Sequence, residues 1–181
     1  TALPALAEAA RTVGSPQIRA AGSLGGNLGT CSPAGDSLPV LSALDAVVHL
    51  QSETSTRTVS FAEFMVGPKR NSRLPNEIIT GVTIPMTNGW QGYAKVGVRN
   101  AMVISVASVC LAIHNGTVRV ALGSVGPTII RCSESEAWIN NVGLENVDHA
   151  VAHEFGDKVR AESRPIDDHR STAEYRRHAV G

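Results

Sequence analysis

The pair Asn115-Gly116 is the feature of this sequence that most restricts its fold. It stands between two apolar stretches, 104–114 and 117–125, that are rich in β-branched residues. Asn-Gly favours a type I′ turn, because both central residues of that turn need a positive φ. We therefore predict a β-hairpin here, with a third strand over 91–98. Helices are predicted after the sheet, and this order is typical of an α+β domain.

The turn-forming segment 85–89, Pro-Met-Thr-Asn-Gly, separates this part of the chain from one with a different pattern. Upstream of it the sequence predicts several short elements: a helix over 2–13, an extended segment at 18–20, a helix from Asp36 to about Leu44, strands at 47–51, 56–59 and 77–84, and a helix from Ser60 to about Val66. We therefore expect two structural units, residues 1–85 and residues 90–181.

The charge composition argues against two classes of partner. The chain has 16 Lys and Arg against 16 Asp and Glu, a formal net charge of zero. Such a balance gives no electrostatic reason to bind nucleic acid or an anionic membrane. The longest apolar run, about 103–113, is too short to span a bilayer. The first residues show no secretory signal, so a cytoplasmic protein is expected.

Metal chemistry is not indicated either. Cys31, Cys110 and Cys132 are far apart and form no CxxC pair, so neither a zinc site nor an iron–sulfur site is predicted. His149 and His153 are spaced i,i+4, but no Glu lies between them as an HExxH motif requires. We expect these histidines on an exposed helix face and predict no metal site.

The segment 22–30, Gly-Ser-Leu-Gly-Gly-Asn-Leu-Gly-Thr, is the main candidate for ligand binding. Without Cβ atoms at 25 and 26, backbone N–H groups can approach a phosphate, and glycine can take the positive φ that an anion-binding nest needs. The segment matches neither a Walker loop nor a Rossmann fingerprint. The residues alone leave two alternatives open: a phosphate-binding loop, or a glycine-rich turn between a strand and a helix.

Three stretches resemble one protein family. They are IRAAGSLGGNLGTCSPAGD at 18–36, YAKVGVRNAMVISVA at 93–107 and PIDDHRSTAEYRR at 165–177. The first is similar to the pattern IRNxGTIGGNxxxxSPxxD of the FAD-binding domain, or medium subunit, of the molybdenum hydroxylases, the family of xanthine and carbon monoxide dehydrogenases. The other two resemble the start and the penultimate helix region of that subunit's C-terminal domain. The blocks occur in the family's order and span nearly the whole chain.

The resemblance implies an FAD site and no catalytic side chain. The family's cofactor contacts fall on Ser23, Leu24, Gly25, Gly26, Asn27, Thr30, Asp36, Ile78, Ile79 and Lys95. In the family, 23–27 wrap the diphosphate and ribityl region. Asp36 would then accept from a ribose or ribityl hydroxyl, unless it is only a helix N-cap. Ile78 and Ile79 would run beside the isoalloxazine ring or simply form a buried strand. Lys95 would raise the flavin's reduction potential, unless it is a solvated strand lysine.

The resemblance also implies the setting of the chain. It predicts the second half of a flavin-binding α/β domain, followed by a C-terminal domain of three-stranded antiparallel sheet plus helices. In the family a small iron–sulfur subunit passes electrons to FAD, a large subunit holds molybdopterin, and NAD or another acceptor reoxidises the flavin. A dimer of heterotrimers is expected. The family's earlier AGGT-like loop has no counterpart in this sequence, so we expect residues 1–181 to be a fragment. Two alternatives stay open: a non-redox module that binds a phosphate ligand, and a degenerate structural subunit.

Overall fold

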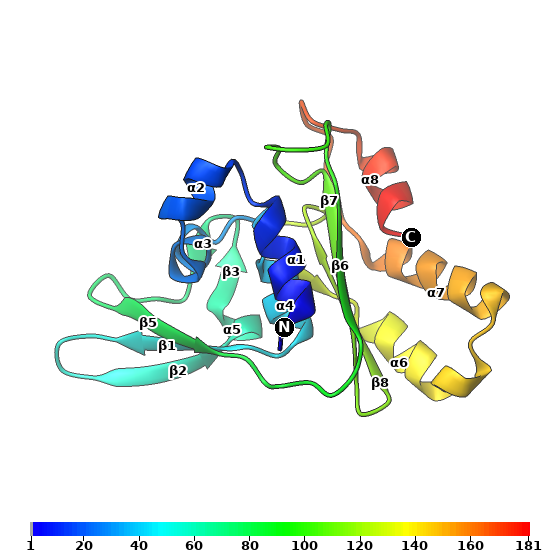
Figure 1. Cartoon of the computed structure of the whole chain (residues 1–181), viewed down its shortest axis with the longest axis horizontal. Coiled ribbons are helices and arrows are strands. Elements are labelled where there is room, and N and C mark those ends of the chain that lie inside the picture. Colours follow the sequence, from blue (N-terminus) through cyan, green and yellow to red (C-terminus); the bar gives the residue numbers. More distant parts are fainter. Residues whose placement is uncertain (1) are drawn as a thin grey trace.

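The Asn115-Gly116 turn organises the larger sheet of the computed structural model, which describes residues 2–181 (Figure 1). Both turn residues have the predicted positive φ, 49° and 77°. They join β7 (Ala107–His114) to β8 (Thr117–Gly123) in an antiparallel hairpin. β6 (Gln91–Val96) pairs with the other edge of β7. The three predicted strands are thus present, although β6 ends earlier and β7 begins later than expected.

A fourth strand corrects the predicted three-stranded sheet. β9 (Ile130–Arg131) pairs with β8, so the strand order is β6-β7-β8-β9. Two residues are too few to give a period-2 pattern, which is why the sequence did not predict this strand.

The larger sheet is covered on both faces (Figure 1). On one face lie α6 (Ser133–Val142), α7 (His149–Glu162) and α8 (Ala173–Val180), with the 3₁₀ helix Leu144–Asn146 between the first two. Val120 and Leu122 of β8 pack there with Val159 and Val180. The opposite face is covered by α1 (Pro4–Thr12) and α4 (Leu38–Ala43). The helices that cover that face come from the part of the chain before the 85–89 segment.

The smaller sheet has strand order β2-β1-β5. β1 (Val47–Gln51) pairs antiparallel with β2 (Thr56–Ser60), as predicted, and with β5 (Ile78–Thr83). The expected capping box is present in part. The Ser60 hydroxyl accepts from the Glu63 N–H, but the Glu63 carboxylate accepts from the Ser60 hydroxyl where a full box would use the Ser60 N–H. The helix it starts, α5 (Phe61–Phe64), stops short of Val66, because β3 (Met65–Gly67) begins there and pairs with β4 (Arg70–Asn71).

Two predictions before residue 31 are wrong. The expected extended segment 18–20 lies in α2 (Pro16–Ala21), where Pro16 takes the first helical position and Ser15 caps the N-terminus. The expected glycine-rich loop is a helix, α3 (Leu24–Thr30), capped by Ser23. Leu28 is buried in the core beside β1, and this packing together with the cap outweighs the poor helix propensity of three glycines.

The α+β class is confirmed, with helices and antiparallel sheets throughout. Within residues 2–181, no helix combines the length and the apolar character that crossing a membrane requires.

Candidate functional site

A groove of about 640 Å³ runs along α3 and is closed on its other side by α1 and α2. We call it the α3 groove. Five of the ten predicted cofactor contacts line it: Ser23, Leu24, Gly26, Asn27 and Thr30. The structure therefore brings the core of the glycine-rich motif to one cavity wall.

The side chains of α3 are held by short local hydrogen bonds. The Ser23 hydroxyl accepts from the Gly26 N–H at 3.0 Å, and the Thr30 hydroxyl donates to the Gly26 carbonyl at 3.0 Å. The Asn27 side-chain oxygen accepts from the Ser37 hydroxyl at 2.6 Å. This bond fixes the Asn27 amide and leaves its NH₂ group without a partner in the described part of the chain. Asn27 can therefore donate to a ligand in the α3 groove.

The glycines of α3 do not form the predicted nest, since none of them has a positive φ. Crowding within the chain accounts only for Gly26, where a Cβ would lie 3.2 Å from the Ser23 hydroxyl that caps the helix. A Cβ at Gly29 would meet no atom within 4 Å, and one at Gly25 would meet only the Ser23 hydroxyl, at 4.0 Å. Glycine costs a helix about 1 kcal/mol relative to alanine at each such position. Neither backbone conformation nor internal packing accounts for this cost, which favours the close approach of another molecule.

Asp36 and Lys95 form a buried ion pair rather than part of the groove lining. Lys95 Nζ on β6 donates to Asp36 Oδ2 at 2.7 Å and to the Thr12 carbonyl at 3.0 Å, and Tyr93 Oη donates to Asp36 Oδ1 at 3.0 Å. The side chains of Asp36 and Lys95 are each only 7% exposed. The two simpler alternatives are therefore wrong: α4 has no side-chain cap, and Lys95 is not solvated. A contact of either residue with the cofactor stays a prediction.

Burial dominates the electrostatics of this pair. It raises the pKa of the Asp36 carboxyl, and the hydrogen bonds and charge of Lys95 oppose that shift only in part. Burial and the Asp36 charge also raise the pKa of Tyr93 above its usual range, so that its hydroxyl stays a donor. The Asp36 carboxylate thus depends on the positive charge of Lys95 to remain ionised inside the protein.

Ile78 and Ile79 lie next to each other on β5, which packs beside α3. Ile79 packs against the core of the smaller sheet, whereas the Ile78 side chain is 64% exposed. The buried-strand alternative therefore holds only for Ile79, because successive strand residues point to opposite faces. Ile78 presents an apolar side chain that the described residues leave uncovered.

The sequence did not predict the other wall of the α3 groove. Its apolar part comes from Leu6 and Ala10 of α1 and from Val13 and Ile18. Arg19 also lines it, and its guanidinium donates to the carbonyls of Val13 and Gly14, each at 2.9 Å. The helical spacing of the apolar residues in 2–13 was the signal for this wall, but only the fold shows that it faces α3.

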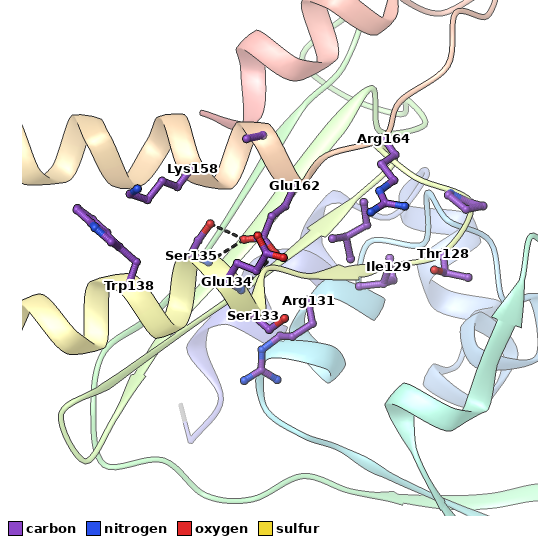
Figure 2. Close-up of a pocket in the computed structure, with 13 residues that line it drawn as sticks. Thr128, Ile129, Arg131, Ser133, Glu134, Ser135, Trp138, Lys158, Glu162 and Arg164 are labelled. Atoms are coloured by element: carbon purple, nitrogen blue, oxygen red, sulfur yellow. Dashed lines mark hydrogen bonds between the residues drawn. The ribbon is translucent and has the colours of Figure 1, made fainter.

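A second groove, also of about 640 Å³, lies between β9, α6 and α7 (Figure 2). The polar side chains that line this groove interact with one another. Glu162 accepts from the Ser135 N–H at 2.8 Å and from the Ser135 hydroxyl at the start of α6, and Lys158 Nζ lies 4.7 Å from the centre of the Trp138 ring. None of the predicted cofactor contacts lines this groove. The candidate site is therefore the α3 groove.

The cysteines lie in the core and take no part in the site. Cys31, Cys110 and Cys132 are all buried as free thiols. Burial raises the pKa of Cys31 to about 11 and that of Cys110 to about 12, so both remain protonated near neutral pH. Across residues 2–181, no cluster of three or more His, Cys, Asp or Glu side chains could hold a metal ion.

Comparison with known proteins gives a family match for each of two segments of the chain. Residues 1–87 match the family model for the FAD binding domain in molybdopterin dehydrogenase, and residues 93–181 match that for the CO dehydrogenase flavoprotein C-terminal domain. Among curated proteins, the chain is 32% identical to the glyceraldehyde dehydrogenase medium chain of Sulfolobus acidocaldarius, covering 98% of this chain and 64% of that one. It is 36% identical to the nicotine 6-hydroxylase medium subunit of Paenarthrobacter nicotinovorans, covering 96% and 62%.

A solved structure agrees in fold. Carbon monoxide dehydrogenase from Hydrogenophaga pseudoflava superposes with a TM-score of 0.89 at 26% identity, over 98% of this chain and 63% of that chain. Quinoline 2-oxidoreductase from Pseudomonas putida 86 gives a TM-score of 0.90 at 20% identity, which supports the fold alone. The chain thus spans slightly less than two thirds of the length of these relatives.

Proposed function

We propose that the chain holds FAD in the α3 groove as the electron-transfer part of an oxidoreductase, because it belongs to the FAD-binding medium subunits of the molybdenum hydroxylases. This family includes the medium subunits of the CO and xanthine dehydrogenases. FAD is the cofactor of this family. The family resemblance inferred from the sequence is confirmed, and the proposal rests on how the groove residues suit that cofactor.

The observation that carries the proposal is Gly25 at the start of α3, a helical glycine that neither its φ nor a clash within the chain requires. The first N–H groups of a helix have no partner within the helix, and the helix dipole favours an anion at this end. The Gly26 N–H already donates to the Ser23 hydroxyl, so the Leu24 and Gly25 N–H groups and the Asn27 NH₂ group would hold the diphosphate of FAD. The bare Gly25 and Gly26 would let it approach the backbone.

The remaining groove residues suit the rest of such a ligand. Leu6, Ala10 and Val13 offer an apolar wall, and the Arg19 guanidinium would add a positive charge that favours an anionic diphosphate. The Thr30 hydroxyl, on the last residue of α3, lines the groove and would accept from a ribityl hydroxyl. When bound, FAD supplies electron transfer in one- and two-electron steps. The chain's own residues orient it and need provide no acid, base or nucleophile.

The remaining predicted contacts form part of the same proposal. Ile78 and Ile79 would run beside the isoalloxazine ring, with the exposed Ile78 side chain free to contact a ligand or a partner. Lys95 would tune the flavin, and Asp36 would accept a ribose or ribityl hydroxyl with a remaining lone pair, since both of its oxygens already accept from the protein.

We extend the proposal to the assembly that the relatives suggest. Carbon monoxide dehydrogenase of Afipia carboxidovorans, like the two curated relatives described above, includes a chain named as its medium chain. Our chain would take electrons from a small iron–sulfur subunit beside a large molybdopterin-binding subunit and pass them to NAD or another acceptor. A dimer of heterotrimers, a cytoplasmic location and a division into units 1–85 and 90–181 complete the proposal.

A pair of glycine variants tests the site. Gly25→Ala and Gly29→Ala both fit the fold, and each is expected to raise the free energy of unfolding of the ligand-free chain by up to about 1 kcal/mol. Only Gly25→Ala should weaken FAD binding, by at least about tenfold (roughly 1.4 kcal/mol), because its methyl group would stand at the start of α3, where the diphosphate is proposed to bind. Fluorescence titration with FAD measures the affinity, and Gly29→Ala is the matched control on the same helix.

Riboflavin sharpens the test, because it lacks the diphosphate. Its binding should be equal in wild type and both variants. Equal FAD affinity for Gly25→Ala and wild type would show that the glycines serve no diphosphate. No detectable FAD binding by the assembled complex would favour a structural subunit. Binding of FAD without reversible bleaching of its 450 nm band by dithionite would favour a non-redox phosphate module.

A further inference from the structure

A third groove, of about 520 Å³, lies between the loops that follow α3 and β3 on one side and the loops that follow β8 and α7 on the other. We call it the junction groove. It shares no lining residue with the α3 groove. Its walls are largely apolar, built from prolines together with Ile166. Several charged side chains also line it, which is uncommon for a groove with largely apolar walls.

The junction groove carries an excess of positive charge. Lys69, Arg164, Arg170 and Arg176 line it, with Asp168 as the single carboxylate. Asp168 is shared, since Arg176 Nη2 donates to its Oδ1 at 2.6 Å and Arg170 Nη2 to its Oδ2 at 2.8 Å. The Arg176 side chain is only 3% exposed. Arg176 Nη1 also donates to the Val106 and Ser124 carbonyls, whereas the Arg170 side chain is 30% exposed. Two guanidinium groups on one carboxylate leave an excess positive charge at the groove.

Asp168 cannot supply more than one negative charge, and it already supplies that one fully. Burial acts to raise its pKa, but the N–H groups of Arg170 and Ser171 and the Arg176 guanidinium outweigh burial and hold the pKa well below its usual range. The other two cations, Lys69 and Arg164, have exposed side chains that are free to meet a ligand. Within residues 2–181, the side chains of Lys69 and Arg164 make no hydrogen bond and no ion pair, and Figure 2 shows Arg164 at the end of the α6–α7 groove away from Trp138.

Unpaired buried polar atoms and strained backbone also occur in the junction groove. The Arg176 Nε and Ser124 Oγ atoms are buried without a hydrogen-bond partner, although most buried polar atoms in proteins have one. Ser124 and Lys69 also have positive φ values, 65° and 55°, which residues with a Cβ rarely adopt. Strained backbone of this kind is found at ligand clamps when the surrounding structure enforces it. Here the Ser124 N–H donates to the Pro33 carbonyl across the groove at 2.8 Å.

We propose that the junction groove binds a small organic anion, with a phosphate or carboxylate group between Lys69 and Arg164 and an apolar body against the proline-rich walls. The groove is much larger than an inorganic oxyanion needs, and the apolar walls would gain contact only from an attached hydrocarbon or aromatic group. The anion balances the charge that Asp168 leaves over. This site does not depend on FAD binding in the α3 groove.

Calorimetric titration of the full chain at fixed ionic strength tests the proposal. The probes are phenyl phosphate and benzoate, with inorganic phosphate and neutral benzamide for comparison. Either phenyl phosphate or benzoate should bind saturably, and each comparison compound should bind at least about tenfold more weakly. Lys69→Gln/Arg164→Gln should weaken the binding of the anionic probe at least about tenfold. Both residues are exposed, so the double variant is expected to fold.

Arg11→Gln/Arg177→Gln is the matched control, because it removes two exposed positive charges away from the junction groove. It should change probe affinity less than about twofold, the effect expected of long-range charge alone. The proposal is overturned if neither anionic probe binds, if the two double variants weaken binding equally, or if inorganic phosphate binds as tightly as phenyl phosphate. FAD titration of the same variants should give the wild-type affinity, so that a failure here is separate from a failure of the α3 site.

Discussion

Replacing Lys95 with methionine should unfold this protein more easily, and the structure indicates by how much. Lys95 Nζ lies 2.7 Å from Asp36 Oδ2, and both side chains are 7% exposed. The substitution keeps most of the apolar stem but leaves a buried carboxylate whose remaining donor is the Tyr93 hydroxyl. Removing one partner of a buried pair costs about 3–5 kcal/mol. For a chain of 181 residues this corresponds to a fall in Tm of roughly 6–20 °C.

The loss should depend on pH, and the sign follows from Asp36. Burial already raises the pKa of this carboxyl, and without Lys95 nothing of opposite charge holds it down. A carboxyl whose pKa is higher in the folded state than in the unfolded state takes up its proton on folding, so its penalty grows as the pH rises through these values. The Tm difference between wild type and Lys95→Met should therefore shrink as the pH is lowered from 8 toward 5.

The assay is thermal unfolding followed by circular dichroism, with Asp36→Leu/Lys95→Met as the control. Replacing a buried pair by apolar residues is often neutral, so the double variant should recover much of the lost Tm. If Lys95→Met melts within about 2 °C of wild type at pH 8, the pair does not hold β6 to the loop before α4, and the argument fails.

Two further predictions concern the fold and its pH dependence. Gly116 has a φ of 77° and open space where a Cβ would stand, so Gly116→Ala should cost about 1–2 kcal/mol of the free energy of urea unfolding through backbone strain alone. Asn115→Gly should cost little. Equal losses for the two variants would contradict the type I′ turn. Hydrogen bonds from Arg57 and from the Leu74 N–H lower the pKa of Glu77 from 4.5 to about 2. The stabilising effect of the ionised Glu77 should be complete above pH 4.5 and disappear as the pH falls toward 2. Glu77→Gln should therefore reduce the acid-side fall of the urea midpoint when the midpoint is plotted against pH. Parallel curves for wild type and variant would refute this pH dependence.

Much of the fold was predictable because its signals are local. A turn that needs two positive φ values can be inferred from Asn115-Gly116 alone, and the capping box at Ser60 requires only a residue three positions on. The glycine-rich segment misled the sequence analysis for a related reason. Intrinsic propensity disfavours a helix there, but Ser23 caps it and Leu28 packs into the core beside β1. Tertiary packing then overrides propensity.

The site was predictable in its glycine motif but not in its surroundings. Ser23, Gly26 and Asn27 could be found by pattern, since they lie within one turn of helix. The apolar wall from α1 and the role of Arg19 could not, because nothing in the sequence states that α1 folds back against α3. The exposure of Ile78 and the burial of Ile79 likewise follow from how β5 sits in its sheet.

The sequence by itself determined the α+β class, the position of the main hairpin and the family, since each depends on neighbouring residues or on motifs that keep their order along the chain. Only the tertiary structure decided that Asp36 and Lys95, 59 positions apart, form one buried pair, and that cations from distant loops line the junction groove. The physical reason is the range of the interactions. Backbone conformation responds to adjacent residues, whereas burial and ion pairing depend on which surfaces the folded chain brings together.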